Sequence, residues 1–484
     1  MKVLFVSPEV NPLVRTGGLG DVVGSLPLAL HKLGVDVRII CPFFRSCKEL
    51  NAQSLPQKIT IRIGNQPITA SFRQTNLGKS RVPVYLVDIP SFFDREGIYS
   101  DQKGDFPDNS QRAFALCQAA MQLAGAIRWQ PDIIHAHDWM AAPVCAYANA
   151  VRSKSKGQAH LRTVLTIHNL QHQGIFSYDD FVTSGLPESN WGMDGFEKNG
   201  SLNLLKGGIQ HADKITTVSP SYASEIRTIE YGCGLEGSLQ YRGADLVGIL
   251  NGIDYEMWDP QRDDALPKPI NPNRPKAGKQ ANKISLLGEL KMGCSPDSPL
   301  FGVVARLYDQ KGVDLLIDLL PRLMDESDAS FAILGSGDPS EEQAILELSS
   351  SFPNRIGSLI GFDDSLARRI FAGSDFFIMP SRFEPCGLAQ QYAMRYGSLP
   401  IARKTGGLAD TIVSFSPGES KSNGFLFDHS TAEDLWDAIQ QALIVYANKR
   451  KLSQMRKNAI SRKCGWDHAA EQYLQTYQWA LELP

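Results

Sequence analysis

The sequence predicts an α/β protein built from two doubly wound domains. Its 484 residues exceed the roughly 250–300 that one hydrophobic core usually serves. Short apolar runs alternate with segments of helical periodicity in both halves of the chain, as in parallel sheets covered by helices. A near-repeat also occurs once in each half, as RTGGLGD at 15–21 and as KTGGLAD at 404–410.

Each copy of this repeat follows an apolar run and precedes a segment that can be helical. Paired glycines permit a positive φ and a close approach of the backbone. The first N–H groups of a helix favour an anion, and the basic residue before the glycines, Arg15 or Lys404, adds positive charge. We therefore expect two similar domains that face one charged ligand.

Composition and charge exclude several classes of protein. Apolar residues make up 43% and charged residues 21% of the chain, and the net charge is −3. This predicts a globular protein with no general attraction to nucleic acid or to an anionic membrane. The eight cysteines form no CxxC pair, residues 1–6 resemble a strand rather than a signal peptide, and the apolar helical stretch 113–127 contains two glutamines. A soluble, cytoplasmic protein is expected.

The first residues predict a βαβ unit with the glycine loop at its first turn. Residues 3–6 and 35–40 are apolar runs, and the helical segment 21–33 between them stops at a glycine. The GxGxxG fingerprint and an acid at the ribose position are both absent, which argues against a dinucleotide cofactor. An antiparallel or mixed patch of strands is then predicted at 59–63, 68–72 and 84–87. A long surface loop at 91–109 and a helix at 110–127 are expected to follow.

The later strands of the first half end in polar residues. They are expected at 131–139, 163–167, 214–218 and 246–250, with a helix from about residue 141. Ligands of open α/β sheets bind beyond the carboxyl ends of the strands. This edge is therefore predicted to be the working face of the first domain.

The second half begins after the clearest shift in composition, at 259–282. Pro, Asn, Lys and Arg dominate this stretch, and it shows no helical or strand periodicity. We interpret this stretch as a loop or hinge connection. A second doubly wound domain is predicted to follow. Its strands are expected at 300–305, 331–334, 375–379 and 399–402, separated by helices such as those at 312–324 and 341–349. An amphipathic helix is expected at 466–483.

Charged residues mark two strand ends of the second half. Arg306 and Lys311 could converge on a pair of phosphates, the first as a planar fork and the second as a point charge. The alternative is that both are solvated surface charges. Glu384 suits recognition of hydroxyl groups or stabilisation of charge, and the alternative is a helix N-cap. Cys386 has no histidine nearby in sequence and is interpreted as a structural thiol.

Histidines mark the strand ends of the first half. His135 and His137 would share one face of a strand, and because no third ligand is evident we predict no metal site. Asp138 and Trp139 could offer a polar group beside a stacking surface for a sugar, although packing is the commoner use of tryptophan. His168 could equally make a structural hydrogen bond.

Nine motifs together resemble those of bacterial-type glycogen (starch) synthases. They are RTGGLGDVVGSLP, HAHDW, TIHNLQHQG, TVSPSYASEI, GILNGID, ARLYDQKG, SRFEPCGL, KTGGLADTI and WDHAAEQYLQTY. The resemblance runs from Met1 to the last helix and implies the GT-B architecture, in which two Rossmann-like domains face each other across a deep cleft. The implied domains are 1–255 on the acceptor side, 256–465 for the nucleotide sugar, and a helix at 466–484 that crosses back to the first domain.

The same resemblance implies the activity. Such enzymes transfer glucose from a nucleoside diphosphate glucose to the non-reducing 4-hydroxyl of an α-1,4-glucan, such as glycogen, starch or maltooligosaccharides, with retention of configuration. The bacterial type favours ADP-glucose over UDP-glucose as donor, and no cofactor is implied. No carboxylate pair is evident that would support a covalent intermediate. We therefore expect a front-face route, with domain closure assembling the site.

Roles follow by matching positions to the family motifs. Arg306 and Lys311 match the cations at the diphosphate, Glu384 the acid at the glucosyl unit, and His168 the histidine near the transferred glucose. The implied substrate-binding residues are Arg15, Gly17, Gly18, Asp21, Asp138, Trp139, Asn251, Cys386, Gly387, Leu388, Thr405, Gly406 and Gly407. The family loop usually begins with Lys where this chain has Arg15, and Met140 replaces the histidine that often follows Trp139.

Two rival interpretations share the two-domain plan. A glucan phosphorylase would need a Schiff-base lysine and bound pyridoxal phosphate. A non-catalytic glucan-binding protein is opposed by the joint presence of Arg15, Arg306, Lys311 and Glu384.

Overall fold

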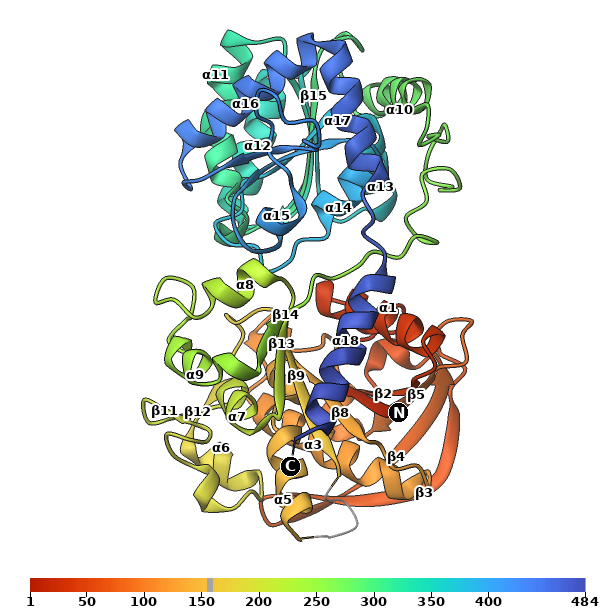
Figure 1. The fold of residues 1–484 in the computed structure, drawn as a ribbon, viewed down its shortest axis with the longest axis vertical. Coiled ribbons are helices and arrows are strands. Elements are labelled where there is room, and N and C mark those ends of the chain that lie inside the picture. The colour runs from red at the N-terminus through yellow and green to blue at the C-terminus, as the bar shows by residue number, and fades with distance from the viewer. Residues whose placement is uncertain (155–159, 484) are drawn as a thin grey trace. The chain divides into compact units, whose positions relative to one another are not determined.

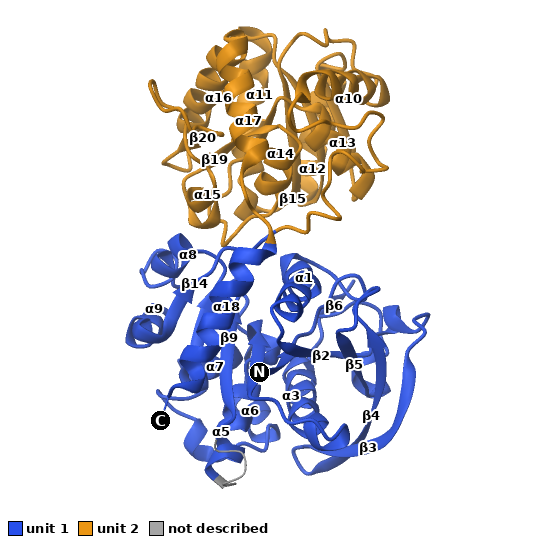
Figure 2. Cartoon of the chain, turned by 45° about the vertical axis from the view of Figure 1, so that its right-hand side comes forward, with its two compact units in different colours: residues 1–252, 466–484 blue, residues 253–465 orange. Residues whose placement is uncertain are grey.

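The structure, a computed structural model, describes residues 1–154 and 160–483 and divides into two compact units (Figures 1 and 2). Unit 1 consists of Met1–Gly252 together with Trp466–Pro484, and unit 2 of Ile253–Gly465. Each unit has its own mostly or wholly parallel sheet. The prediction of two doubly wound α/β domains is therefore confirmed.

The sheet of unit 1 has the strand order β14-β13-β9-β8-β1-β2-β5-β4-β3, parallel from β14 to β5 and antiparallel at β4 and β3. Parallel strands are buried on both faces, which explains their continuous apolar runs. The strands are β1 (Lys2–Val6), β2 (Asp36–Pro42), β3 (Gln53–Ile63), β4 (Gln66–Asn76), β5 (Pro83–Asp88), β8 (Ile133–His137), β9 (Arg162–Ile167), β13 (Lys214–Thr217) and β14 (Leu246–Gly248).

The helices of unit 1 connect these strands, and two small sheets lie outside the main one. The helices are α1 (Gly18–Lys32), α2 (Pro90–Phe93), α3 (Asn109–Ala126), α4 (Asp138–Ala141), α5 (Val144–Lys154), α6 (Tyr178–Thr183), α7 (Leu204–His211), α8 (Pro220–Glu225), α9 (Glu236–Tyr241) and α18 (Trp466–Leu481). The small sheets contain β6 (Ser100–Asp101) with β7 (Gly104–Asp105), and β10 (Ile175–Phe176), β12 (Ser201–Asn203) and β11 (Glu197–Lys198).

The long surface loop predicted at 91–109 is only partly a surface loop. Phe92, Phe93 and Phe106 are buried there. The guanidinium of the buried Arg112 lies 5.5 Å from the ring centre of Phe93 and 5.0 Å from that of Phe106. Cation–π contacts with a helix residue thus hold the aromatic part of the loop in the core, although its Asp, Gly, Phe and Tyr residues had suggested a surface loop.

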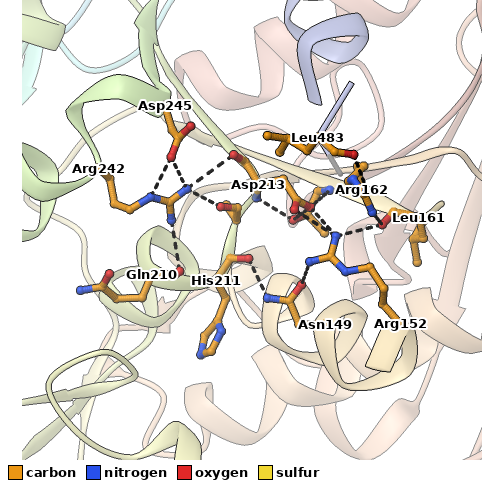
Figure 3. A network of polar contacts seen from close by, with 12 residues as sticks. Asn149, Arg152, Leu161, Arg162, Gln210, His211, Asp213, Arg242, Asp245 and Leu483 are labelled. Atoms are coloured by element: carbon orange, nitrogen blue, oxygen red, sulfur yellow. Dashed lines mark hydrogen bonds and ion pairs between the residues drawn. The ribbon is translucent and has the colours of Figure 1, made fainter. Parts of the chain in front are cut away.

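The last helix, α18, completes unit 1. The Tyr477 hydroxyl on α18 lies 2.8 Å from Nδ1 of His135 on β8, and the helix also packs against α1. Arg162 on β9 donates to the carbonyl of Leu483 at 2.8 Å (Figure 3). Unit 1 therefore includes residues that follow all of unit 2 in sequence.

Two arginines, Arg152 and Arg242, form polar networks near the amino ends of strands β9, β13 and β14 (Figure 3). The carboxyl ends of the strands, described below, lie at the opposite edge of the sheet. Arg152 donates to both carboxylate oxygens of Asp213 at 3.0 Å, and Asp213 accepts from the Thr163 N–H at 2.8 Å. Arg242 donates to Asp245 at 3.1 Å and to three carbonyls at the carboxyl end of α7, at 2.6, 3.1 and 2.6 Å. A cation there satisfies helix carbonyls and complements the helix dipole.

The sheet of unit 2 is parallel throughout, in the order β17-β16-β15-β18-β19-β20. Residues on alternate faces of a strand enter different cores. Phe331 and Ile333 on β16 pack with α11 and α16, whereas Ala332 and Leu334 pack with α10 and α13. Helices therefore cover both faces, as the period of two along the strand requires.

The elements of unit 2 follow in sequence. They are α10 (Pro275–Glu289), β15 (Leu300–Leu307), α11 (Val313–Glu326), β16 (Ser330–Gly337), α12 (Pro339–Ser351), β17 (Ile356–Ile360), α13 (Asp364–Gly373), β18 (Phe376–Met379), α14 (Ala389–Arg395), β19 (Leu399–Arg403), α15 (Gly406–Thr411), β20 (Phe425–Phe427), α16 (Ala432–Ala447) and α17 (Lys449–Ser461). The loop predicted at 259–282 is wrong from Pro275 onward, where α10 begins with proline at its start. Among the described residues, no helix is long and apolar enough to cross a membrane.

Each sheet has one point at which the chain reverses its direction of winding. In unit 1 this point lies between β1 and β8, and in unit 2 it lies between β15 and β18. Ligands of open α/β sheets bind at such switch points, beyond the carboxyl ends of the strands. The two switch points therefore direct attention to the loops after these four strands.

Candidate functional site

Lys311 and Glu384 form an ion pair at the switch point of unit 2. Lys311 follows β15 and Glu384 follows β18, and Nζ lies 2.6 Å from Oε2. The Ser381 hydroxyl donates to the same oxygen at 3.2 Å. Glu384 is only 6% exposed, so protein groups rather than water satisfy its carboxylate. The N-cap alternative for Glu384 is wrong, because Leu388 occupies the N-cap position of α14.

A cavity of about 80 Å³ lies beside this ion pair. Lys311, Ser381 and Glu384 line it together with Gly387 and apolar residues of β15 and β18. Charges that are largely withdrawn from water interact more strongly with a ligand than solvated charges do. The cavity therefore offers an ammonium for an anion and a carboxylate for a hydroxyl group.

Arg306 lies on the same strand end but is not part of the ion pair. Its side chain is exposed, and it forms no ion pair or side-chain hydrogen bond with any residue that the structure describes. Lys311, by contrast, has a side chain that is 18% exposed. The surface-charge alternative therefore fits the surroundings of Arg306 and does not fit those of Lys311.

The second glycine loop, residues 404–410, packs against the segment that carries Glu384. A Cβ built on Gly406 would lie 2.0 Å from the carbonyl oxygen of Glu384, and one built on Gly407 would lie 2.0 Å from that of Cys386. Gly406 also has a φ of +43°. The Gly407 N–H donates to the carbonyl of Glu384 at 3.1 Å. Packing against this segment thus accounts for both glycines, which the sequence had suggested were free to approach a ligand.

The other predicted residues of unit 2 lie in these same two segments. Cys386 is 5% exposed, in line with a structural thiol. Gly387 has a φ of +66° and leads through Leu388 into α14. Thr405 occupies the N-cap position of α15. The structure therefore brings the predicted loops of unit 2 together around Glu384.

The first glycine loop, residues 15–21, has open space where the second has packing. A Cβ built on Gly17 or on Gly18 would meet no atom within 4 Å. Gly17 has an extended backbone with a φ of −162°, and α1 begins at Gly18. Neither packing nor backbone strain requires glycine at these positions. Open space before a helix N-terminus suits the approach of an anion.

Glu9, which our sequence analysis did not identify, holds the first glycine loop in place. Its carboxylate accepts hydrogen bonds from the Thr16 N–H and hydroxyl, both at 2.6 Å, and from the Gly17 N–H at 3.2 Å. The Tyr99 hydroxyl donates to it at 2.8 Å. Glu9 is 3% exposed and follows β1, so the rule that polar groups lie at strand ends could have found it.

Arg15 and Asp21 form a two-point ion pair within this loop. Nη2 lies 3.0 Å from Oδ2, and Nε lies 3.0 Å from Oδ1. Asn11 also donates to Asp21 at 3.0 Å. Burial raises the pKa of Asp21, and the charge of Arg15 offsets part of that rise. A guanidinium has five N–H donors, so Arg15 keeps donors for a further anion.

Asp138 and His168 meet where β8 and β9 end. The Asp138 carboxylate accepts from the His168 N–H at 2.6 Å, and Asp138 itself has a φ of +55°. Burial raises the pKa of Asp138 to about 8 and lowers the pKa of His168 to about 3. The His168 ring, 3.0 Å from Nδ1 of His137, is therefore neutral near pH 7. Strained backbone of this kind is often found at functional sites.

His135 and His137 share one face of β8, as predicted, with ring centres 4.2 Å apart. His135 lies within hydrogen-bonding distance of Tyr477 and of Thr166. Burial lowers the pKa of both histidines. They therefore act as neutral hydrogen-bonding groups, and no group of three His, Cys, Asp or Glu in the described part of the chain could hold a metal ion.

Trp139 and Asn251 complete the predicted set in unit 1. Trp139 is half-buried, and a Cβ on Gly174 would lie 2.5 Å from its ring. Packing therefore accounts for one side of the indole, as the alternative proposed. Asn251 lies just beyond β14 and is 6% exposed. Both residues lie at the carboxyl edge of the unit 1 sheet.

The two switch points differ in their chemistry. The edge of unit 1 holds the acids Glu9 and Asp138 with a neutral histidine, groups that suit hydroxyls, beside Arg15 and the open glycine loop, which suit an anion. The edge of unit 2 holds Arg306, Lys311 and one paired acid, groups that suit phosphates. The structure thus separates the predicted residues into two sets, one in each unit.

The chain is similar to known glycosyltransferases in sequence. Residues 2–241 match the starch synthase catalytic domain and residues 291–462 match glycosyl transferases group 1. The chain is 41% identical to glycogen synthase 2 of Geobacter sulfurreducens, over 100% of this chain and 99% of that protein. It is also 41% identical to glycogen synthase of Geotalea daltonii, over 99% of both.

Solved structures agree with these relatives. The catalytic domain of starch synthase IV from Arabidopsis thaliana, bound to ADP and acarbose, matches with a TM-score of 0.90 and 32% identity over 99% of both chains. Sucrose-phosphate synthase from Thermosynechococcus elongatus, at 17% identity and a TM-score of 0.58 over 99% of this chain and 98% of that one, shares the fold.

Proposed function

Since the chain belongs to the glycogen (starch) synthase family of glycosyltransferases, we propose that it is an ADP-glucose:(1,4)-α-D-glucan 4-α-D-glucosyltransferase. It transfers glucose from ADP-glucose to the non-reducing 4-hydroxyl end of glycogen, starch or a maltooligosaccharide, with retention of configuration. The relative from Arabidopsis thaliana was bound to ADP, which supports an adenine nucleotide as the donor.

The ion pair of Lys311 and Glu384 carries this proposal. Negative charge develops on the diphosphate as its bond to glucose breaks, and a fixed, partly buried ammonium stabilises that charge. The Lys311 Nζ lies in such a position beside the cavity of unit 2. Glu384 holds the ammonium there and can accept a hydrogen bond from a glucose hydroxyl. Arg306, exposed on the same edge, binds the diphosphate from outside.

The remaining predicted residues bind the substrates in this proposal. Gly17, Gly18 and Arg15 approach the donor phosphates, supported by the open space before α1. His168 offers a neutral ring to the transferred glucose and Asp138 fixes its backbone. The other substrate-binding positions named in the sequence analysis line the same two edges.

We infer a front-face route for the transfer. The bond between C1 of glucose and the diphosphate oxygen breaks, and the acceptor 4-oxygen bonds to C1 on the same face. The acceptor proton passes to the departing phosphate oxygen. Among the residues that line the cavity, Glu384 is the only carboxylate, and Lys311 and Ser381 already engage it. A retaining enzyme with a covalent intermediate needs two carboxylates about 5 Å apart. Trapping a glucosyl-enzyme adduct would overturn this route.

A donor competition assay tests the proposal. Labelled ADP-glucose and UDP-glucose are offered separately and together with a glycogen primer, and label in the precipitated glucan is counted. We expect ADP-glucose to be preferred and the new linkage to be α-1,4 by NMR. Lys311→Ala should strongly reduce incorporation, and Arg322→Ala, which removes an exposed cation that pairs with Glu326, should not. Preference for UDP-glucose would overturn the donor assignment.

The rival functions give different results in the same preparation. A non-catalytic glucan-binding protein would retain glucan without incorporating label from either donor. A glucan phosphorylase would show the visible absorbance of bound pyridoxal phosphate. We also infer a cytoplasmic location, supported by eight free cysteines. Fractionation of the source cells tests it.

A further inference from the structure

A second hollow in unit 2 shares no residue with the cavity at Lys311 and Glu384. Its volume is about 640 Å³. Four cations line it, and no acidic residue does. The cations are Arg395 at the end of α14, Lys457 on α17, and Arg462 and Lys463 just beyond α17. Such a lining is unexpected in a protein whose net charge is −3.

The positive charge comes chiefly from residues 449–463, which contain seven cations and no acid. Some of these cations have partners within unit 2. Arg456 pairs with the buried Asp375, and Lys451 donates to a backbone carbonyl at 2.8 Å. The three that line the hollow form no ion pair with any residue the structure describes. The segment thus holds more positive charge than unit 2 neutralises.

The two arginines of the hollow are held by neutral groups. Arg462 donates to the carbonyl of Asp410 at 3.3 Å, and Arg395 to the carbonyl of Trp258 at 3.3 Å. The Arg395 guanidinium lies 4.7 Å from the centre of the Tyr255 ring. These contacts fix the side chains without cancelling their charges. Like charges gathered in one hollow repel each other, and an anion between them removes that repulsion.

The hollow borders both connections between unit 2 and the rest of the chain. The Ile253 N–H donates to the carbonyl of Cys464 at 2.8 Å, and the Cys464 N–H donates to the Tyr255 hydroxyl at 2.7 Å. Tyr255 lines the hollow beside the segment where the chain leaves unit 2. On its other side, Arg395 ends α14, the helix that follows the Glu384 segment.

We propose that this hollow binds a small molecule that carries a phosphate or diphosphate group. Guanidinium forks match phosphate oxygens in geometry, and the lysines add point charges. The volume lies in the range of small-molecule pockets, and the four cations line one hollow to which α14 and residues 457–463 both contribute, which favours a small ligand over nucleic acid. The bound ligand ties the end of α14 to the segments where the chain enters and leaves unit 2.

Titration with inorganic pyrophosphate, followed by calorimetry, tests this site in the full chain. The variant Arg462→Ala/Lys463→Ala removes two lining cations. Its matched control, Lys449→Ala/Arg450→Ala, removes two cations of the same segment that do not line the hollow. Because each lost charged hydrogen bond weakens binding by about tenfold or more, we expect the first variant to bind at least about tenfold more weakly. The control and Lys311→Ala should keep the binding to this hollow.

Hydrogen exchange places the bound probe and checks folding. Pyrophosphate should slow exchange at 455–463 and at the carboxyl end of α14 in wild type and control, but not in the double variant. Protection only at 404–410, or loss of binding only in Lys311→Ala, would assign the probe to the other cavity and overturn the proposal. Equal weakening in the control would reduce the effect to general charge. Binding of an RNA oligomer but not of pyrophosphate would favour nucleic acid instead.

Discussion

Gly407→Ala and Gly18→Ala make the same change at equivalent positions of the two glycine loops, and the structure predicts opposite outcomes. A Cβ on Gly407 would lie 2.0 Å from the carbonyl oxygen of Cys386 and 2.5 Å from its Cα. Both are backbone atoms, so no side-chain rotation relieves the clash. A Cβ on Gly18 would meet nothing within 4 Å. We expect the first change to destabilise unit 2 and the second to leave unit 1 as stable as before.

The size of the effect follows from the contact. Overpacking a well-packed site costs about 1–3 kcal/mol, and a backbone clash at 2.0 Å belongs at the upper end of that range. For a domain the size of unit 2, each kcal/mol shifts Tm by roughly 2–4 °C, so a cost of about 3 kcal/mol in Gly407→Ala should lower it by about 6–12 °C. Alanine is favoured over glycine in helices by up to about 1 kcal/mol. At Gly18 this small gain is the whole expected effect on stability.

The assay must distinguish the two units, because a protein of two domains need not unfold in one step. Hydrogen exchange at β18 and β19 reports on unit 2, and exchange at β1 and β8 reports on unit 1. Glucose incorporation into glycogen is measured in parallel. Gly407→Ala should lower both stability and activity, because the Gly407 N–H holds the Glu384 carbonyl. Gly18→Ala should lower activity alone.

Two results would refute this reasoning. A Gly407→Ala protein as stable as the wild type would show that the Cys386 segment yields without penalty and that packing does not explain the glycine. A Gly18→Ala protein with normal stability and normal activity would remove Gly18 from the donor site.

Four further outcomes are expected. Lys311→Ala should lower kcat about 10²–10³-fold with unit 2 folded, as loss of a charge-stabilising group does, and normal turnover with ADP-glucose would exclude it from the site. Arg15→Lys should retain donor binding, measured as KM, if phosphate contact alone matters, whereas a collapse would show that the fork on Asp21 is needed. The pKa of Asp138, raised to about 8, means that the folded state keeps a proton that the unfolded state releases. The stability that this group contributes should therefore fall from about pH 4 to pH 8, so the difference in unfolding free energy between wild type and Asp138→Asn, measured by urea unfolding, should change across that range. Arg242→Ala should destabilise unit 1 by about 1–3 kcal/mol through the carbonyls it leaves at the end of α7, without changing KM.

Periodicity predicted those elements whose burial is continuous. Most residues of the strands β1, β8, β9, β15 and β18 are buried, and their apolar runs are visible in sequence without any knowledge of their neighbours. Helix α10 was missed because the face that it buries begins with polar residues, Lys279, Asn282 and Lys283, and its buried Leu286 and Leu287 lie beyond the stretch we assigned to a loop. Composition alone cannot distinguish such a helix start from a linker.

Some residues of the candidate site could likewise be predicted from sequence, and others could not. The strand-end rule selected Lys311, Glu384, Asp138 and His168 because topology brings the carboxyl ends of parallel strands to one edge. The same rule would have found Glu9, which follows β1, but its hold on the glycine loop through Thr16 and its contact with Tyr99 are visible only in the structure. The glycine loops look alike as strings of residues, and only the three-dimensional neighbours of Gly407 show why they differ.

The place of α18 in unit 1 has a consequence for synthesis of the protein. Residues 466–481 leave the ribosome after all of unit 2, which at about 5–20 residues per second takes roughly 10–40 s to make. During that time His135 lacks Tyr477, and the site in which Tyr473 and Tyr477 are completely buried in the fold is uncovered. Unit 2 is continuous in sequence and can fold as it emerges. The half of the protein that is translated first is therefore the half that is finished last, and chaperones should be needed for the nascent first half rather than for the second.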